Sequence, residues 1–351
     1  MDRTGASARS GPLLAPFANT LPRIGDPIDA ARDAAVLGRA ILGARARLGA
    51  RSVIRADGEP IEIGEDFSLG HGATVHIAPG LPTKIADRVT VGRNAVVHAS
   101  TLSHDCIVGD DAVVLDGSHL GAGAVLAPGT IVYPRSKLEG GWRYGGNPAV
   151  PRERMDDAQR AALRREMGEA SPELFGGGAS DAGIALHRDH FLAPTARLAG
   201  TVQTDAGVGI WYGCRLDGTA HGITIGANTN VQDNAVIRAV DGPVVIGADV
   251  TIGHNVWLTD CTVEPNCLIG IGAHLAPLTA VERDVLVAAG ARTQTGQRLR
   301  SGHVWGGNPA RPIASMDATK RALLAATLAT YRAYAKHFRE ARHTTLREQG
   351  T

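Results

Sequence analysis

Apolar residues recur at every sixth position along most of this chain. Such steps stand at Val36, Leu42, Leu48 and Ile54 near its start, and at Ile246, Ile252 and Leu258 in the stretch VVIGADVTIGHNVWLTDC. A period of six matches neither the α-helix nor the alternation of an ordinary strand. It is typical of a hexapeptide parallel β-helix, a triangular prism whose coils stack about 4.8 Å apart through backbone hydrogen bonds. We therefore predict an all-β solenoid.

The repeat pattern is written twice. The two copies end in nearly the same words, GGNPAVP over residues 145–151 and GGNPARP over 306–312, and a helical sequence follows each. This duplication predicts two tandem parallel β-helices, each followed by a C-terminal α-helix. We assign residues 1–26 to a disordered tail, 27–167 to the first domain, 168–184 to a Gly/Ser-rich linker and 185–345 to the second domain.

Composition narrows the class of function. The formal net charge is only +1, which gives no field to attract nucleic acid or an anionic membrane. No run approaches the roughly eighteen apolar residues that a transmembrane helix needs. The four cysteines show no CxxC pairing, and the basic N-terminal stretch lacks the apolar core of a targeting peptide. We expect a cytoplasmic protein that acts on a small molecule and has no nucleic-acid or membrane partner.

Counting in steps of six places two histidines together in the first copy. We name the side of the prism that begins at Val75 face A, and the two sides that follow it faces B and C. His76 and His98 each follow an apolar step on face A, one coil apart, so their side chains should point outward and stack within reach of one ion. Arg55 and Asp57 lie on the same face one coil earlier. A catalytic zinc needs three protein ligands and an open position, and this pair supplies two.

The second copy carries its ligand-type residues on a different face. Gln232 and Asp233 follow Val231 on face C, with Asn230 at the corner before them, and His254 lies one coil further on. If face A of the first domain met face C of the second, His254 would join the histidine pair as a third ligand. The reverse interface would gather a set with too many cations to bind zinc, namely Arg238, Thr259, Arg93 and His71.

The words ITIGANTNVQDNAVIR, VTIGHNVWLTDC and GGNPA resemble the γ-class carbonic anhydrases and their hexapeptide-repeat relatives. The resemblance covers residues 36–338 and implies left-handed β-helices assembled as trimers. It also implies zinc at the subunit interfaces, with iron or cobalt as alternatives, held by two histidines of one subunit and one of the next. On matched positions the three ligands of the family fall on His76, Arg93 and His98 in the first copy and on Arg238, His254 and Thr259 in the second.

Neither copy holds a full ligand set, whereas the two together hold one. The resemblance thus implies a single composite site with His76, His98 and His254 as metal ligands and Arg55, Asp57, Asn230, Gln232 and Asp233 around them. It implies a zinc-dependent enzyme in which a zinc-bound hydroxide attacks CO₂ or a related electrophilic carbon, as part of a homo-oligomer based on trimers.

Other interpretations stay open at this point. Arg55 and Asp57 also fit an ordinary interface ion pair, and Gln232 and Asn230 also fit groups that satisfy the backbone at a corner. The whole chain also fits a catalytically degenerate scaffold subunit, a biosynthetic enzyme acting on an acyl ester or thioester, or an acyl-CoA-dependent acyltransferase. If like domains trimerise with like, the first domain meets Arg93 instead of His254 and no complete site forms.

Overall fold

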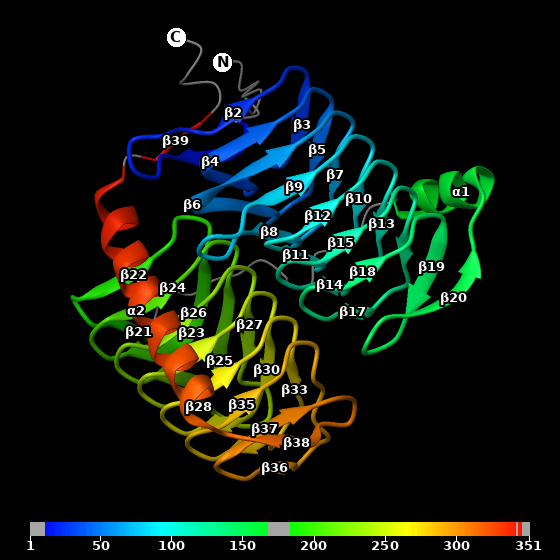
Figure 1. Ribbon diagram of the computed structural model, residues 1–351. Helices are drawn as coiled ribbons and strands as arrows, with labels where there is room; N and C mark the ends of the chain where they lie inside the picture. The colour runs from blue at the N-terminus through cyan, green and yellow to red at the C-terminus, as the bar shows by residue number, and fades with distance from the viewer. Residues whose placement is uncertain (1–10, 168–182, 342, 346–351) are drawn as a thin grey trace, which may run out of the picture.

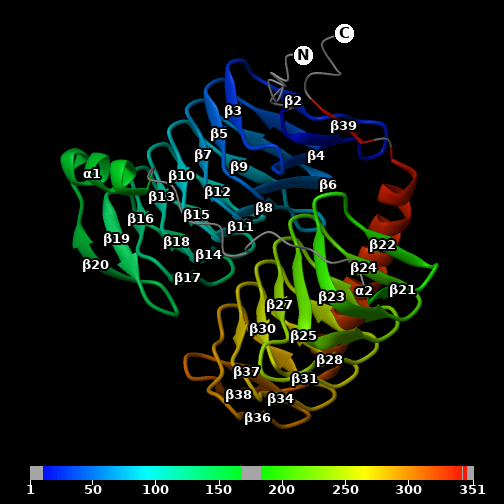
Figure 2. The same cartoon turned by 180° about the vertical axis from the view of Figure 1, so that it is seen from behind.

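The computed structural model describes residues 11–167, 183–341 and 343–345. It contains two triangular β-helices that lie side by side, the first drawn in blue to green and the second in green to orange (Figure 1, Figure 2). Their strands pair almost entirely in parallel, coil upon coil. The prediction of an all-β solenoid made of two left-handed parallel β-helices, each followed by an α-helix, is confirmed.

Each β-helix consists of one sheet that bends around an edge to cover faces A and B, and of a second sheet that forms face C. The bent sheet of the first β-helix contains β1 (Leu13–Ala15), β2 (Arg23–Ile24), β4 (Ala35–Leu42), β6 (Val53–Ile63), β8 (Thr74–His76), β9 (Thr83–Ile85), β11 (Val96–His98), β12 (Thr101–Leu102), β14 (Val113–Val114), β15 (His119–Leu120), β17 (Ile131–Val132), β18 (Lys137–Leu138) and β39 (Thr344–Thr345). Its face C contains β3 (Ile28–Ala30), β5 (Ala46–Leu48), β7 (Ser68–Leu69), β10 (Thr90–Val91), β13 (Ile107–Val108), β16 (Val125–Leu126), β19 (Trp142–Gly145) and β20 (Val150–Arg154).

The second β-helix repeats this plan. Its bent sheet contains β21 (Ile184–Leu186), β23 (Arg197–Thr204), β25 (Arg215–Ile225), β27 (Val236–Arg238), β28 (Val244–Ile246), β30 (Trp257–Thr259), β31 (Thr262–Val263), β33 (His274–Leu275), β34 (Ala280–Val281) and β36 (Arg298–Leu299). Its face C contains β22 (His190–Leu192), β24 (Val208–Ile210), β26 (Asn230–Val231), β29 (Thr251–Ile252), β32 (Leu268–Ile269), β35 (Leu286–Val287), β37 (His303–Gly306) and β38 (Arg311–Ser315).

The six-residue step explains both the interior and the corners of each prism. The apolar step residues, such as Val75, Val97 and Ile252, point inward and form one continuous core per prism. The corners between faces adopt left-handed backbone conformations at residues such as Asn94 and Asn255. Asparagine, aspartate and glycine tolerate this conformation better than other residues, which is why they recur between the steps.

Face A of the first β-helix packs against face C of the second. Corner asparagines of the second copy reach across: Asn255 receives a hydrogen bond from Thr74 Oγ1 at 2.7 Å, and Asn234 Nδ2 donates to the same hydroxyl at 3.0 Å. Further along, Val113 and Ile131 form an apolar cluster that Ile271 contacts. The interface therefore combines a polar half and an apolar half.

Two helices follow the β-helices. Helix α1 (Asp157–Met167) has no buried residue. Helix α2 (Ala318–Glu340) begins after the N-cap Asp317, whose side chain accepts a hydrogen bond from the backbone of Lys320, and it lies along one flank of the paired prisms (Figure 1). The buried face of α2, which includes Tyr331 and Phe338, packs with residues of both copies. No helix in the described part of the chain is long and apolar enough to span a membrane.

The prediction of a disordered tail over residues 1–26 is wrong for the part that the structure describes. Strand β1 pairs in parallel with β4 and antiparallel with β39, and Leu14 is fully buried. The apolar residues of LLAPF extend the first coil, a signal that the Ala, Ser and Pro content of the stretch obscured. Residues 1–10 lie outside the described residues, and so do residues 168–182 of the linker predicted over 168–184. Ile184, at the end of that range, already belongs to β21.

Candidate metal centre between the two β-helices

Three imidazole rings meet where the two prisms touch. His76 ends β8 and His98 ends β11, and the two residues are direct partners in the parallel ladder. His254 lies at the corner after β29 of the other copy. His76 Nδ1 lies 3.1 Å from His98 Nε2 and 3.2 Å from His254 Nε2. One ring nitrogen of each histidine lies within 4.8 Å of the others, a spacing that fits a single metal ion.

Each of the three rings turns its second nitrogen toward a carboxylate. Asp57 Oδ1 lies 2.8 Å from His76 Nε2, and Asp116 Oδ1 lies 2.6 Å from His98 Nδ1. Asp233 Oδ2 lies 3.2 Å from His254 Nδ1, close enough for an ion pair but without the geometry of a hydrogen bond. Histidine ligands of metals commonly have such an outer carboxylate, which fixes the tautomer and makes the inner nitrogen a better donor. Asp116 was not among the residues singled out from the sequence.

This arrangement implies that three lone pairs converge. If each outer nitrogen donates its hydrogen to its carboxylate, the three inner nitrogens carry none and cannot hydrogen-bond to one another. Burial lowers the pKa of His254 to about 4 and that of His76 well below its ordinary value, so these two rings are neutral at pH 7. A cation between the inner nitrogens is the partner that satisfies all three, and nitrogen donors of this kind suit zinc.

Arg55 ties the carboxylates of the two copies together. Its Nε donates to Asp233 Oδ2 at 2.8 Å, its Nη1 pairs with Asp57, and its guanidinium stacks on Trp211 with 4.5 Å between Cζ and the ring centroid. Arg55 is completely buried, as are both carboxylates. Burial raises the pKa of Asp57 to about 6, against the opposing effect of Arg55. Burial also acts to raise the pKa of Asp233, but Arg55 and His254 together hold it below its ordinary value. The sequence allowed two roles for Arg55, as part of an interface ion pair or as a residue of the site, and its contacts fit both.

The remaining predicted residues lie beside the histidines. Gln232 is almost fully buried, and its Nε2 donates to Asn230 Oδ1 at 3.2 Å. Asn230 Nδ2 donates in turn to Thr251 Oγ1 at 3.0 Å. Gln232 borders the cleft that leads to the histidines, whereas Asn230 lies behind it. Asn230 therefore orients Gln232 and does not itself line the cleft.

The C-terminal helix contributes a site residue that sequence reasoning missed. Tyr331 of α2 accepts a hydrogen bond from Arg55 Nη2 at 2.9 Å, and its hydroxyl lies 3.2 Å from His254 Nε2. Burial raises the pKa of Tyr331 far above its ordinary value, so the phenol keeps its proton. In the sequence Tyr331 is one residue of the helical segment that follows the second copy, and a helical pattern does not reveal where a helix docks.

A cleft of about 510 Å³ opens from the histidines toward solvent. It is bounded by the first β-helix, by face C of the second and by helix α2. His76, His98, Gln232 and Tyr331 form its inner end. The predicted site residues Arg55, Asp57 and Asp233 lie behind this end and are closed off from solvent.

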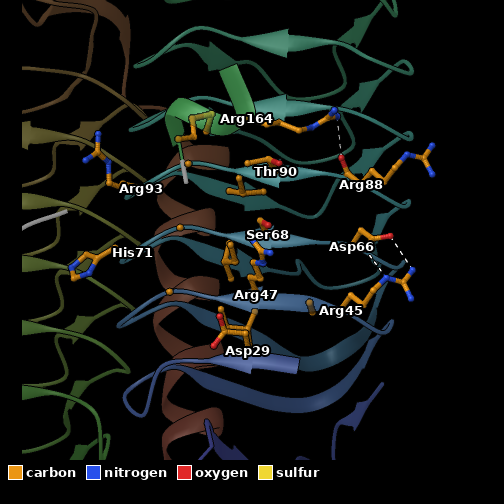
Figure 3. A pocket seen from close by; sticks show the side chains of 18 of the residues that line it. Asp29, Arg45, Arg47, Asp66, Ser68, His71, Arg88, Thr90, Arg93 and Arg164 are labelled. Carbon is orange, nitrogen blue, oxygen red and sulfur yellow. Dashed lines mark hydrogen bonds and ion pairs between the residues drawn. The ribbon is translucent and has the colours of Figure 1, made fainter. Parts of the chain in front are cut away.

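A second hollow, of about 900 Å³, lies on face C of the first β-helix, away from the three histidines. Figure 3 shows His71 and Arg93 at its edge and several arginines along it. Ion pairs join Arg45 to Asp66 and Arg88 to Asp105, so much of this positive charge is neutralised in place. The residues that the reverse interface would need are thus spread over surfaces that the two prisms do not share.

Known proteins resemble this chain in sequence and in fold. No family model matches the chain. It is 38% identical over 153 residues to γ-carbonic anhydrase 1 of Arabidopsis thaliana mitochondria, a match covering 42% of this chain and 56% of that protein. It is 32% identical over 133 residues to protein YrdA of Escherichia coli, covering 36% of this chain and 72% of YrdA. Among solved structures, a putative acetyltransferase from Desulfovibrio desulfuricans aligns over 95% of this chain and 86% of its own, with a TM-score of 0.53 and 13% identity.

The fold and the histidine cluster define a hexapeptide-repeat β-helix protein with a candidate metal centre. More narrowly, the chain belongs to the γ-carbonic-anhydrase-like family, as a tandem duplication with divergent copies. It spans about half the length of the mitochondrial relatives it matches, and the acetyltransferase likeness concerns the fold alone.

Proposed function

We propose that the chain is a metal-dependent hydratase of the γ-carbonic anhydrase type, with CO₂ as the simplest substrate. His76, His98 and His254 would hold the metal, which we take to be zinc, with iron or cobalt as alternatives. The observation that carries this proposal is the convergence of three imidazole nitrogens whose opposite sides all face carboxylates. The similarity to γ-carbonic anhydrases supports the same chemistry.

The ligand set fits a catalytic metal better than a structural one. Three imidazole ligands would leave a metal ion with a position for water, and zinc held in this way would supply a water whose pKa is about 7, the magnitude known from carbonic anhydrase. This water would reach the cleft, because His76 and His98 line its inner end while His254 is closed off behind them.

The surrounding residues would then position the reactants. Gln232 borders the cleft with its amide nitrogen committed to Asn230, which leaves Oε1 to accept a hydrogen bond from the reacting water. Arg55 holds Asp57 and Asp233 in place and so orients two of the three ligands. Tyr331 keeps its proton and can donate it to a hydrogen-bond acceptor at the inner end of the cleft.

The proposal is tested by measuring metal content and CO₂ hydration on the same purified samples. We expect wild-type protein to carry metal and to hydrate CO₂, and His254→Ala to lose both. Arg238→Ala is the matched control, because Arg238 occupies in the second copy the place of His76 in the first, and this variant should retain both properties. A wild-type chain that binds no metal after zinc is supplied would instead support a non-catalytic scaffold.

We infer that the assembly is a homo-oligomer based on trimers, as in the family that the sequence resembles. This part of the proposal is independent of the metal centre, because all three histidines come from one chain. Light scattering of the intact protein gives the mass that tests it.

A further inference from the structure

The cleft in front of the histidines is much larger than CO₂ requires. Its volume of about 510 Å³ falls within the range of roughly 300–1,000 Å³ that is usual for sites of drug-sized ligands. A water molecule in the liquid occupies about 30 Å³, so a triatomic substrate would use only a small part of this space. The question is therefore what chemistry the rest of the cleft would recognise.

One wall of the cleft changes from polar to apolar with distance from the histidines. Outward-facing residues on face C of the second β-helix stack in register as Thr251, Leu268 and Leu286. Leu268 and Leu286 are partly buried, because they pack against a cluster that includes Leu324 of α2, and both still line the cleft, so its outer part has an apolar wall. From the Thr251 rung to Leu286 the strand spacing gives about 10 Å, the reach of a short aliphatic chain.

The other walls continue this apolar surface. Helix α2 presents Leu323, which is 53% exposed, together with Ala326 and Thr327. The first β-helix contributes Ile77 after β8 and Leu115 after β14. An exposed leucine beside half-buried ones around a concave surface is typical of a ligand-binding groove.

The charges of the cleft indicate a neutral ligand. No lysine or arginine is among the residues that line it, and its one acidic lining residue is Asp116. An acyl donor that carries phosphates would find no lysine or arginine side chain along this cleft to pair with them.

We infer that the cleft accepts a neutral carboxylic ester with an aliphatic acyl chain. The ester carbonyl would lie at the histidines and Gln232, and the chain would lie along Leu268 and Leu286 toward Leu323. In the reaction, the oxygen of water forms a bond to the acyl carbon and the bond from that carbon to the alcohol oxygen breaks. One proton of the water goes to the departing alcohol, and the other is released when the carboxylic acid ionises. This inference rests on the proposed function, because it uses the same metal centre.

Binding is the first readout, since it does not depend on the metal. Acetamide and hexanamide are neutral mimics of the acyl part that water does not cleave readily, and calorimetry on the metal-free chain measures their affinities. A fully buried methylene contributes about 0.8 kcal/mol, or roughly fourfold in affinity, so hexanamide should bind at least about tenfold more tightly than acetamide. Leu323→Ser should reduce this ratio, whereas Leu278→Ser, at a corner leucine that is 68% exposed and does not line the cleft, should leave it unchanged.

Hydrolysis is the second readout. For the zinc-loaded chain we expect kcat/KM to rise at least about tenfold from p-nitrophenyl acetate to p-nitrophenyl hexanoate, and Leu323→Ser to flatten this dependence. Equal affinities for the two amides, or chain-length-dependent binding without any ester hydrolysis by a zinc-loaded chain that hydrates CO₂, would overturn the inference. A chain that binds no zinc and hydrates no CO₂ would instead overturn the proposed function, and the amide titration would still report on the cleft.

Discussion

At the scale of single residues, the carboxylates behind the histidines set the properties of the site. Asp116 lies 2.6 Å from His98 Nδ1 and is the least buried of the three carboxylates. Removing an outer partner of a ligating histidine typically weakens metal binding about 10- to 100-fold. We expect Asp116→Asn to weaken zinc binding by this factor in a chelator competition assay. Asp241→Asn, at an exposed position of the second copy, is the control and should bind zinc like the wild type.

The buried titratable groups also predict how the metal-free protein responds to acid. The pKa of His254 is lowered to about 4 and that of His76 is lowered well below its ordinary value, both chiefly by burial, so the unfolded chain takes up protons on these rings below about pH 6.5 while the folded chain does not. Asp57 acts in the opposite sense, because its pKa is raised to about 6 in the folded state. Burial lowers the pKa of His274 to about 4 as well, so the histidines outweigh the one carboxyl by at least one proton, and stability should fall as the pH drops from 6.5 toward 4.

The expected loss is of the order of 1 kcal/mol for each pH unit, since one net proton corresponds to about 1.4 kcal/mol per unit. Urea unfolding of the metal-free protein at pH 6.5 and pH 5 measures it. His254→Asn removes one of the groups and should flatten the dependence, whereas His119→Asn, at an exposed position, should not. Equal or greater stability of the wild type at pH 5 would refute this assignment of protons.

At the scale of elements, helix α2 holds the two β-helices together. Phe338 is 1% exposed and packs in a cluster with Leu37 of the first copy and Trp211 of the second. Replacing a buried phenylalanine by alanine typically costs about 3–5 kcal/mol. Phe338→Ala should lower the free energy of unfolding by about this amount, and Leu323→Ala, on the exposed side of the same helix, should change it by less than about 0.5 kcal/mol. Similar losses for the two variants would show that α2 does not dock as described.

A pair of glycines tests the apolar half of the interface. Gly290 and Gly296 both have positive φ, at 70 ± 5°, so an alanine introduces comparable backbone strain at either position. A Cβ at Gly290 would lie 2.3 Å from Ile131 Cδ1 of the first β-helix, whereas at Gly296 nothing lies within 4 Å. Gly290→Ala should therefore cost about 1–3 kcal/mol more than Gly296→Ala in chemical denaturation. Equal costs would mean that the prisms do not pack closely at this point.

The sequence predicted the elements better than their docking. The six-residue step was enough to put His76, His98, Arg55 and Asp57 on one face. The ladder pairs Arg55 with His76 and His76 with His98, one coil apart in each case. Asp116 follows the next apolar step on that face, so the same counting could have identified it. Tyr331 was not, because its place depends on how α2 lies across two prisms, and hexapeptide spacing carries no information about that contact.

At the scale of the whole molecule, the duplication brings together within one chain three histidines that, by the resemblance to the family, two subunits would otherwise supply. Face A of the first copy kept the histidine pair and face C of the second kept His254, while the faces that do not meet carry Arg93 and Arg238 at the corresponding positions. A site whose residues are divided in this way between the two copies is complete within a single chain. The trimer-based assembly stays a prediction.

A mixing experiment distinguishes a site within one chain from a site between chains. His76→Ala and His254→Ala chains would be unfolded together, refolded together and assayed for zinc. If ligands came from different chains, some mixed assemblies would regain an intact set and bind zinc. Because the structure takes all three ligands from one chain, we expect the mixture to bind no more zinc than either variant alone.

The most direct test of the composite centre is the zinc content per chain of the purified wild type and of His254→Ala. We expect one zinc per chain in the wild type and none in the variant, although His76 and His98 in the other β-helix are unchanged. Full zinc content in His254→Ala, with the fold intact by circular dichroism, would contradict the claim that the two β-helices share one metal centre.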